Sequence, residues 1–106
     1  MTKLVIHSLI CNETSDGMGA DDIFINFQGI RVWGTTLVDA GQTHQMEAEL
    51  DFNVRGRVDV WEFDSGSDND HIGTFWVNRS QAGTGERSVS LTGDDSDYII
   101  TYEVLS

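Results

Sequence analysis

The sequence predicts an all-β protein, an eight-stranded antiparallel β-sandwich. Apolar and polar residues alternate with period two along most of the 106 residues, whereas no window repeats apolar residues at the helical spacing. Gly, Asp, Asn and Ser interrupt the alternation at short intervals, as they do in turns. Proline, which disrupts strands inside a sheet, is absent from the sequence.

Each expected strand is a short run that alternates between two turn segments. The fourth is the clearest, because Met46, Ala48, Leu50 and Phe52 alternate with acidic residues. In the first strand Leu4, Ile6 and Ser8 share one face, and in the last Tyr98 to Val104 alternate in the same way. The expected strands span residues 4–11, 22–28, 30–35, 46–52, 57–63, 71–79, 86–92 and 97–105.

Length and composition indicate one domain over residues 1–106, with no linker and no second domain. Cys11 is the only cysteine, so an internal disulfide is excluded, and we expect it to be a buried apolar residue. The segment MTKLVIHSLIC is too short for a membrane span and lacks a cleavage site for a signal peptide. We therefore expect a cytoplasmic or peripheral membrane protein.

The chain is strongly acidic, with 18 acidic and 6 basic residues and a net charge of −12. Nucleic-acid binding depends largely on Lys and Arg at the phosphates, so this charge disfavours a nucleic-acid partner. It also disfavours unaided binding to an anionic membrane.

Alternating strand directions place the turns in two groups. The turns at 12–21, 36–42, 64–70 and 93–96 fall at one end of the sandwich, and those at 28–29, 53–56 and 80–85 at the other. The first end collects Asp16, Asp21, Asp22, Asp39, Glu62, Asp64, Asp68, Asp70, Asp94 and Asp95. The second holds Arg55, Arg57, Arg79 and Arg87.

Carboxylates are most concentrated between Arg57 and Gly73, in the segment RVDVWEFDSGSDNDHIG. Two like charges ~4 Å apart repel by about 4 kcal/mol at an effective dielectric of 20. A cation with a preference for oxygen ligands removes this repulsion, and calcium is the usual one. The segment therefore predicts a calcium site.

These residues resemble a C2 domain, the family of calcium- and phospholipid-binding β-sandwiches. In that family the third calcium loop follows a strand that ends Trp-Asp-x-Asp, and a further Asp and a hydrophobic-Gly pair come after it. The segments Trp61–Asp64 and Asp70–Gly73 are similar in sequence and spacing. The two Asp of the family's first loop, six residues apart, resemble Asp16 and Asp22. The single strand before that loop is similar to the type II, phospholipase-like strand order.

The resemblance implies a calcium site with Asp16, Asp22, Glu62, Asp64 and Asp70 at the five ligand positions. Asp39, Asp21 and Asp68 are further candidate ligands. The sequence departs from the family at Glu62, where Asp is usual, at Ile23, where Pro is usual, and in its shorter chain.

Other interpretations of the acidic turns compete with a calcium site. Asp, Asn, Ser and Gly are also favoured in turns for backbone reasons, which is the interpretation we prefer for Asp94, Asp95 and Asp97. An EF-hand is excluded, because Asn69 and Phe75 occupy the positions of its Gly and Glu. Paired acids can hydrolyse glycosides, but acids on exposed turns do not form a substrate cleft, and we expect no enzymatic activity.

Two functions from different classes follow. The first is a calcium-dependent module that binds anionic phospholipid headgroups, with Met18, Leu37 and Val38 entering the membrane interface. The second is a calcium-stabilised module that binds a protein, a glycan or its own copies and has no lipid function. The three Trp are expected in the core, and an outward-facing one would favour a glycan ligand.

Overall fold

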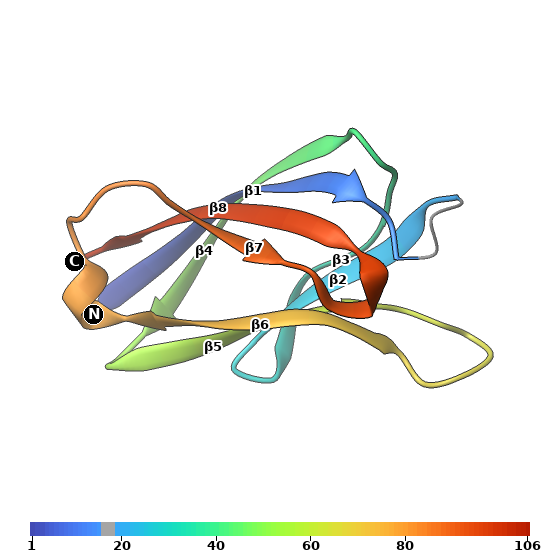
Figure 1. Cartoon of the computed structure of the whole chain (residues 1–106). Helices are drawn as coiled ribbons and strands as arrows, with labels where there is room; N and C mark the ends of the chain where they lie inside the picture. Colours follow the sequence, from blue (N-terminus) through green and yellow to red (C-terminus); the bar gives the residue numbers. More distant parts are fainter. Residues whose placement is uncertain (16–18) are drawn as a thin grey trace.

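The computed structural model describes residues 1–15 and 19–106. Its eight strands form two antiparallel four-stranded sheets, with strand orders β4-β1-β8-β7 and β3-β2-β5-β6. The sheets lie face to face in a body of 40 × 25 × 19 Å (Figure 1). The predicted fold class is confirmed. The strands are β1 (Thr2–Glu13), β2 (Asp21–Phe27), β3 (Ile30–Val38), β4 (Thr43–Phe52), β5 (Arg55–Glu62), β6 (Asp70–Asn78), β7 (Arg87–Leu91) and β8 (Asp97–Leu105).

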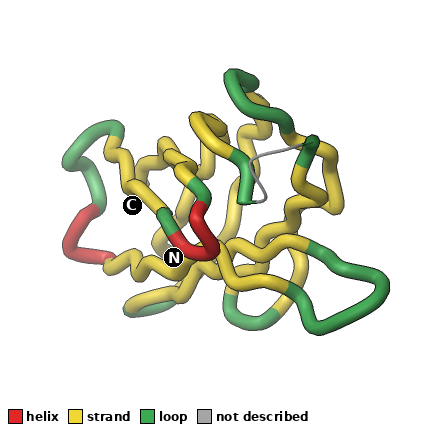
Figure 2. Tube along the Cα trace, turned by 45° about the vertical axis from the view of Figure 1, so that its right-hand side comes forward, coloured by secondary structure: helices red, strands yellow, loops and turns green. Residues whose placement is uncertain are grey.

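Helical structure in the described residues is limited to two single turns of 3-10 helix, η1 (Arg79–Gln81) and η2 (Gly93–Asp95). Figure 2 shows them as short segments between strands. Because neither turn approaches the length of a membrane span, no described helix can cross a bilayer.

The core lies between the two sheets and consists of the inward-facing residues of each strand. The predicted alternation holds in β4, β5 and β8, where Phe52, Val60 and Ile100 are buried. Cys11 is also fully buried, as expected. Among the described residues, every buried side-chain nitrogen and oxygen atom has a hydrogen-bond partner. Alternation with apolar inner faces is thus sufficient to explain the two-layer arrangement.

In β1 the expected alternation is wrong after Ile6. The register of β1 shifts between Ile6 and Ser8 against both β4 and β8. An extra residue in a strand reverses the faces of all residues that follow it. Leu9, rather than Ser8, therefore continues the core face that begins with Leu4 and Ile6.

Strand β3 is longer than predicted and the following turn is shorter. It continues through Thr36 and Leu37 to Val38, because these residues pair with Ile23, Asp22 and Asp21 of β2. Smaller differences occur in β1, which extends to Glu13, and in β5, which begins at Arg55. Pairing with a neighbouring strand, which no local pattern encodes, adds these residues to the sheet.

His7 lies at the register shift of β1, between two glutamates on the outer face of the sheet. Its Nδ1 is 2.8 Å from Glu47 Oε2 on β4, and its Nε2 is 3.0 Å from Glu103 Oε1 on β8. Desolvation opposes the charged imidazolium, but the hydrogen bonds to both carboxylates outweigh it. The pKa of His7 is therefore raised above its ordinary value.

Gly93 allows η2 to pack directly on the backbone of β6. A Cβ atom at this position would lie 2.5 Å from the carbonyl oxygen of Ile72 and 2.7 Å from that of His71. Because both contacts are to backbone atoms of a paired strand, neither can move without disturbing the sheet. Gly93 thus determines how closely Asp94 approaches the start of β6.

We predict that His7→Gln destabilises the protein more near pH 6 than near pH 8.5. Because the pKa of His7 is higher in the folded state, the protonated side chain stabilises the fold. This contribution to the free energy of unfolding is complete below the unfolded-state pKa of about 6.5 and is lost as the pH rises through the folded-state pKa. At the lower pH the loss should be about 0.5–1 kcal/mol, which urea unfolding can measure. Lys3→Gln, which breaks the Lys3–Glu49 ion pair, is the control and should cost the same at both pH values. An equal cost of His7→Gln at both pH values would contradict the assignment.

We also predict that Gly93→Ala lowers the free energy of unfolding by about 1–3 kcal/mol, the usual cost of forcing atoms into a packed region. Gly66→Ala is the matched control, because its Cβ would contact only the Asp64 Oδ1 atom at 3.8 Å. Chemical denaturation should therefore separate the two variants. Equal stabilities would show that η2 can move away from β6.

Candidate functional site: the loop end of the sandwich

One end of the sandwich holds four connections, which we call the loop end. It lies at the right of Figure 1. The register establishes the grouping, since Glu13 pairs with Asp97 and Glu62 pairs with Asp70. The predicted grouping of the turns is therefore confirmed. The connections are residues 14–20 (β1–β2), 39–42 (β3–β4), 63–69 (β5–β6) and 92–96 (β7–β8).

Three carboxylates of the loop end come together in space. Glu62 ends β5, Asp70 begins β6, and Asp94 belongs to η2. One oxygen from each lies within 4.8 Å of the others, and their burial ranges from buried Glu62 through half-buried Asp70 to exposed Asp94. We call this group the carboxylate cluster.

The strand register explains two members of the carboxylate cluster. Glu62 lies directly opposite Ile23 of β2 and opposite Asp70 of β6. Residues directly opposite each other project from the same face of a sheet. Because Ile23 is fully buried in the core, Glu62 and Asp70 also face the interior, at the point where the core opens to the loops.

The dimensions and chemistry of the carboxylate cluster fit a calcium ion. Calcium binds oxygen ligands at 2.3–2.6 Å, so two ligand oxygens on one ion are at most about 5 Å apart. The separations in the cluster are within this limit. Carboxylate oxygen is also the ligand type that calcium prefers. Glu62, Asp70 and Asp94 are thus the described residues that could hold the ion.

A buried hydrogen-bond network connects Glu62 to Ser15, Asp21 and Tyr98. Ser15 Oγ lies 2.8 Å from Glu62 Oε1 and 2.8 Å from Asp21 Oδ1, and the Ser15 N–H donates to Asp21 Oδ2. Asp21, which is fully buried, also accepts from the Tyr98 hydroxyl. Burial and the neighbouring Asp21 carboxylate raise the pKa of Tyr98, so its hydroxyl stays protonated and donates. The network fixes the start of the 14–20 connection against β5.

Asp64, another predicted ligand, lies outside the carboxylate cluster. Its exposed side chain accepts from the Gly66 N–H at 3.0 Å and from the Ser67 hydroxyl at 2.8 Å. These two bonds lower the pKa of the Asp64 carboxyl. In this conformation Asp64 organises the 63–69 loop, while Asn69 accepts from its N–H.

The remaining predicted ligands are distributed around the rim. Asp22 is half-buried on β2, and its carbonyl accepts from the Phe63 N–H. Asp39 and Asp68 are exposed, and Asp39 accepts from the Ala40 N–H. The structure thus brings Glu62 and Asp70 together, and leaves Asp22 and Asp64 outside the cluster. Asp16 lies outside the described residues.

Asp94 belongs to the carboxylate cluster, whereas the sequence favours ordinary turn chemistry at this position. The grouping of turns by strand direction does put residues 93–96 at the loop end. What the sequence does not indicate is that Gly93 brings this turn onto the backbone of β6. The Asp94 backbone is also left-handed, with φ 56°.

The predicted membrane contacts require one correction. Val38 is fully buried, because the extension of β3 turns its side chain into the core, so it cannot meet a membrane. Leu37, one residue earlier, faces outward and is 66% exposed. Phe63, which no sequence pattern singles out, is 43% exposed at the loop end. Met18 lies outside the described residues.

Comparison with known proteins gives matches of structure but none of sequence. No protein-family model matches the chain, and no curated protein matches it.

Of three solved structures that resemble the chain, two are described as C2 domains. One, described as the structure of a C2 domain, has a TM-score of 0.59 at 15% identity, with all of both chains covered. A C2 domain of plant extended synaptotagmin 1 has a TM-score of 0.55 at 10% identity and covers 98% of this chain and 91% of that chain. Human GIVD cytosolic phospholipase A2 has a TM-score of 0.55 at 9% identity and covers 99% of this chain, which spans 17% of that chain. This chain is therefore a C2-like β-sandwich.

Proposed function

We propose that this C2-like domain binds calcium at its loop end and, when loaded, attaches to anionic phospholipid headgroups. The observation that carries the proposal is the carboxylate cluster, in which oxygens of Glu62, Asp70 and Asp94 lie within 4.8 Å of one another. Three like charges at such a distance are costly, and a divalent cation with oxygen ligands relieves their repulsion.

The chain's own residues would form the calcium site in two layers. Glu62, Asp70 and Asp94 would supply the ligands, and Ser15 would orient Glu62 through the hydroxyl that bridges it to Asp21. Asp64, on the 63–69 loop, and Asp22, near the start of β2, are additional candidate ligands. Bound calcium would supply positive charge and open coordination positions for phosphate oxygens.

Two exposed apolar side chains support a membrane as the target. Leu37 lies one residue before the end of β3, opposite Asp22 of β2, and Phe63 begins the 63–69 loop between Glu62 and Asp64. Without a cation, these acids would be repelled by an anionic membrane, whose surface is near −30 mV. Apolar contact would therefore become available only after calcium has reduced the negative charge.

A second candidate function is binding of a protein or glycan without lipid. The observation in its favour is Trp76, which is 52% exposed on the outer face of β6, whereas the sequence predicts all three Trp residues in the core. Large aromatic side chains at exposed strand positions are common in binding surfaces. Calcium would then stabilise the loop end without meeting the ligand.

We predict that calcium raises the melting temperature. A ligand at a hundredfold excess over its dissociation constant stabilises the native state by ~2.7 kcal/mol. For a domain of this size the shift is roughly 10–20 °C. Glu62→Gln and Asp94→Asn should both reduce the shift, because each removes one charged ligand from the cluster.

Asp95→Asn provides the matched control for Asp94→Asn. Both residues lie in η2 with left-handed backbones, but only Asp94 belongs to the carboxylate cluster. Asp95→Asn should keep the full calcium shift. An unchanged melting curve of the parent protein in several millimolar calcium, or equal effects of the two substitutions, would refute the site.

We further predict that the protein sediments with phosphatidylserine vesicles only when calcium is present. Leu37→Ser with Phe63→Ser should weaken this sedimentation and leave the calcium-induced melting shift intact, because neither side chain is a ligand. Leu105→Ser is the control, since Leu105 is 40% exposed at the end of β8, away from the loop end. Sedimentation in chelator would contradict the mechanism. Absence of sedimentation when calcium is bound would favour the second function.

A further inference from the structure

The charge of the molecule is divided between its two ends. All six Lys and Arg residues lie on strand ends or turns in the half of the sandwich away from the loop end. They are Lys3, Arg31, Arg55, Arg57, Arg79 and Arg87. The described acids at the loop end are Glu13, Asp21, Asp22, Asp39, Glu62, Asp64, Asp68, Asp70, Asp94, Asp95 and Asp97.

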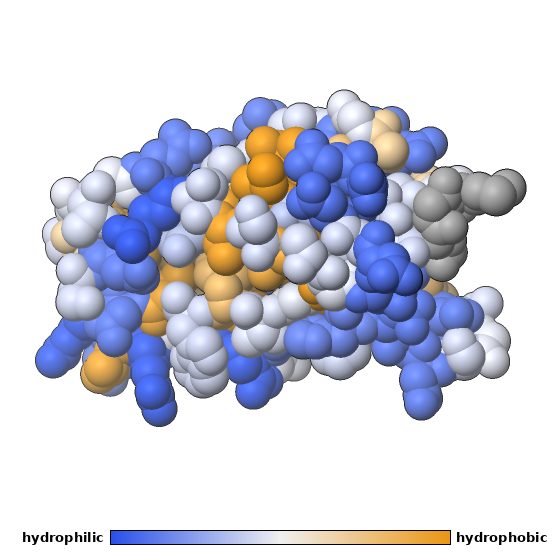
Figure 3. Space-filling view, in the orientation of Figure 1, coloured by the Kyte–Doolittle hydropathy of each residue, from blue (hydrophilic) through white to orange (hydrophobic). Residues whose placement is uncertain are grey.

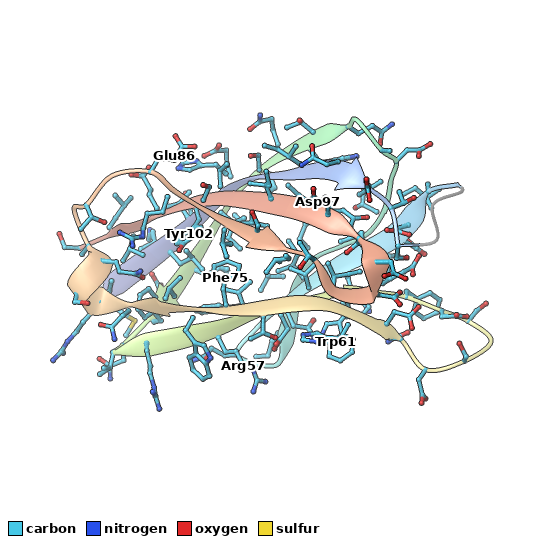
Figure 4. The ribbon with its side chains drawn as sticks, viewed as in Figure 1. Arg57, Trp61, Phe75, Glu86, Asp97 and Tyr102 are labelled. Carbon is cyan, nitrogen blue, oxygen red and sulfur yellow. The ribbon has the colours of Figure 1, made fainter. Side chains whose placement is uncertain are left out.

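The acidic residues outside the loop end are as numerous as the basic residues, so the opposite half is close to neutral. They are Glu47, Glu49, Asp51, Asp59, Glu86 and Glu103. The described acids of the loop end therefore carry nearly all of the net charge of −12. Figure 4 shows this division, with oxygen-tipped side chains at the loop end and nitrogen-tipped side chains, Arg57 among them, below β5.

Within the opposite half, the positive charge is concentrated on one sheet. Arg31 belongs to β3, Arg55 and Arg57 belong to β5, and Arg79 directly follows β6 as the first residue of η1. Lys3 and Arg87 belong to the other sheet. Of the described acids in this half, only Asp59 lies on the same sheet, where it pairs with Arg57 at 2.8 Å. Lys3, by contrast, is already paired with Glu49.

The same region exposes apolar side chains among its arginines. Ile30, Val54 and Trp76 are 70%, 48% and 52% exposed, and the Arg55 guanidinium lies 5.1 Å from the centre of the Trp76 ring. Figure 3 shows a hydrophobic group between hydrophilic side chains at the lower left, below the start of β5 and the end of β6. We call Ile30, Val54, Trp76, Arg55 and Arg79 the basic patch.

The loop end has the complementary composition. Its exposed apolar residues are Leu37, opposite Asp22, and Phe63, between Glu62 and Asp64. In the basic patch, by contrast, Trp76 lies against the Arg55 guanidinium. Interfaces commonly combine an apolar centre, rich in aromatic residues and Arg, with a charged rim. The two ends of one molecule therefore have the properties of the two sides of one interface.

We propose that the basic patch docks on the loop end of a second copy of this chain, so that molecules associate head to tail. Such a contact joins different surfaces of the two copies, and it leaves one free end of each kind. The assembly can therefore extend beyond a dimer. Arginine of a second copy and calcium are alternative counter-charges for the same carboxylates.

The charge distribution gives this association an unusual dependence on salt. At about 0.01 M salt the Debye length is ~30 Å, so the negative charges of whole molecules repel one another. At about 0.1 M it is ~10 Å, which screens distant charges and leaves pairs in contact effective. At about 1 M it is ~3 Å, and the contact pairs are weakened as well. Association should be strongest at the intermediate concentration.

Sedimentation velocity in chelator tests the contact independently of calcium binding. We expect the weight-average sedimentation coefficient to rise with protein concentration, most steeply near 0.1 M salt. At high concentration the coefficient should exceed the value of a dimer. Arg55→Glu with Arg79→Glu should abolish the rise. Lys3→Glu with Arg87→Glu makes the same change in net charge on the other sheet. This control variant should retain most of the rise in the sedimentation coefficient.

A mixing experiment tests whether the two surfaces meet. The variant Arg55→Glu with Arg79→Glu keeps its loop end, and the variant Leu37→Ser with Phe63→Ser keeps its basic patch. Each variant should be monomeric alone. Their mixture should form a one-to-one dimer, in which the intact basic patch of one variant contacts the intact loop end of the other. The dimer should not grow further, because its two free surfaces carry the substitutions. Circular dichroism of each variant checks that the fold is retained.

The proposal is overturned if the parent protein shows no concentration dependence near 0.1 M salt. It is also overturned if the mixture remains monomeric, or if the control on the other sheet abolishes association as completely as the Arg55 and Arg79 variant. Failure of calcium binding would leave the result in chelator unchanged, so the two proposals fail separately.

Discussion

The pairing of Glu62 with its two neighbouring strands is the constraint on which the loop end depends. Glu62 lies opposite Ile23 and opposite Asp70, so the register that buries the core of this sheet also turns two carboxylates toward the same point. A slip of one residue would move Glu62 to the outer face. The packing that stabilises the fold therefore also holds these two carboxyl groups close together.

Hydrogen bonds position several carboxylates of the loop end. Ser15, Asp21 and Tyr98 form a network at the base of the loops, and Asp64 is held by donors of its own loop. Hydrogen bonds to a carboxylate favour its charged form. In the 63–69 loop the Gly66 and Ser67 donors lower the pKa of Asp64 and so favour its charged form.

The charge of the molecule is distributed unevenly along its long axis, with one acidic end and one end that carries the arginines. In an antiparallel sandwich alternate connections fall at opposite ends, so turn composition alone can make one end acidic and the other basic. Here the acidic turns all connect odd-numbered strands to the next, and the arginines gather where the even-numbered strands end. A calcium ion, a membrane and a second copy of the chain would each meet the molecule in a defined orientation.

Local sequence determined the fold class, the strands and the grouping of the turns, because alternation and turn residues act over a few positions. The spacing between Glu62 and Asp70 likewise indicated that they would meet across one turn, as they do. Tertiary structure alone decided the rest. Val38 is buried because β3 continues along β2. The faces of β1 reverse at His7 because β1 has one extra residue against β8. Asp94 joins the cluster because Gly93 has no side chain to hold η2 away from β6. Each depends on contact between segments far apart in the chain, which periodicity and spacing do not encode.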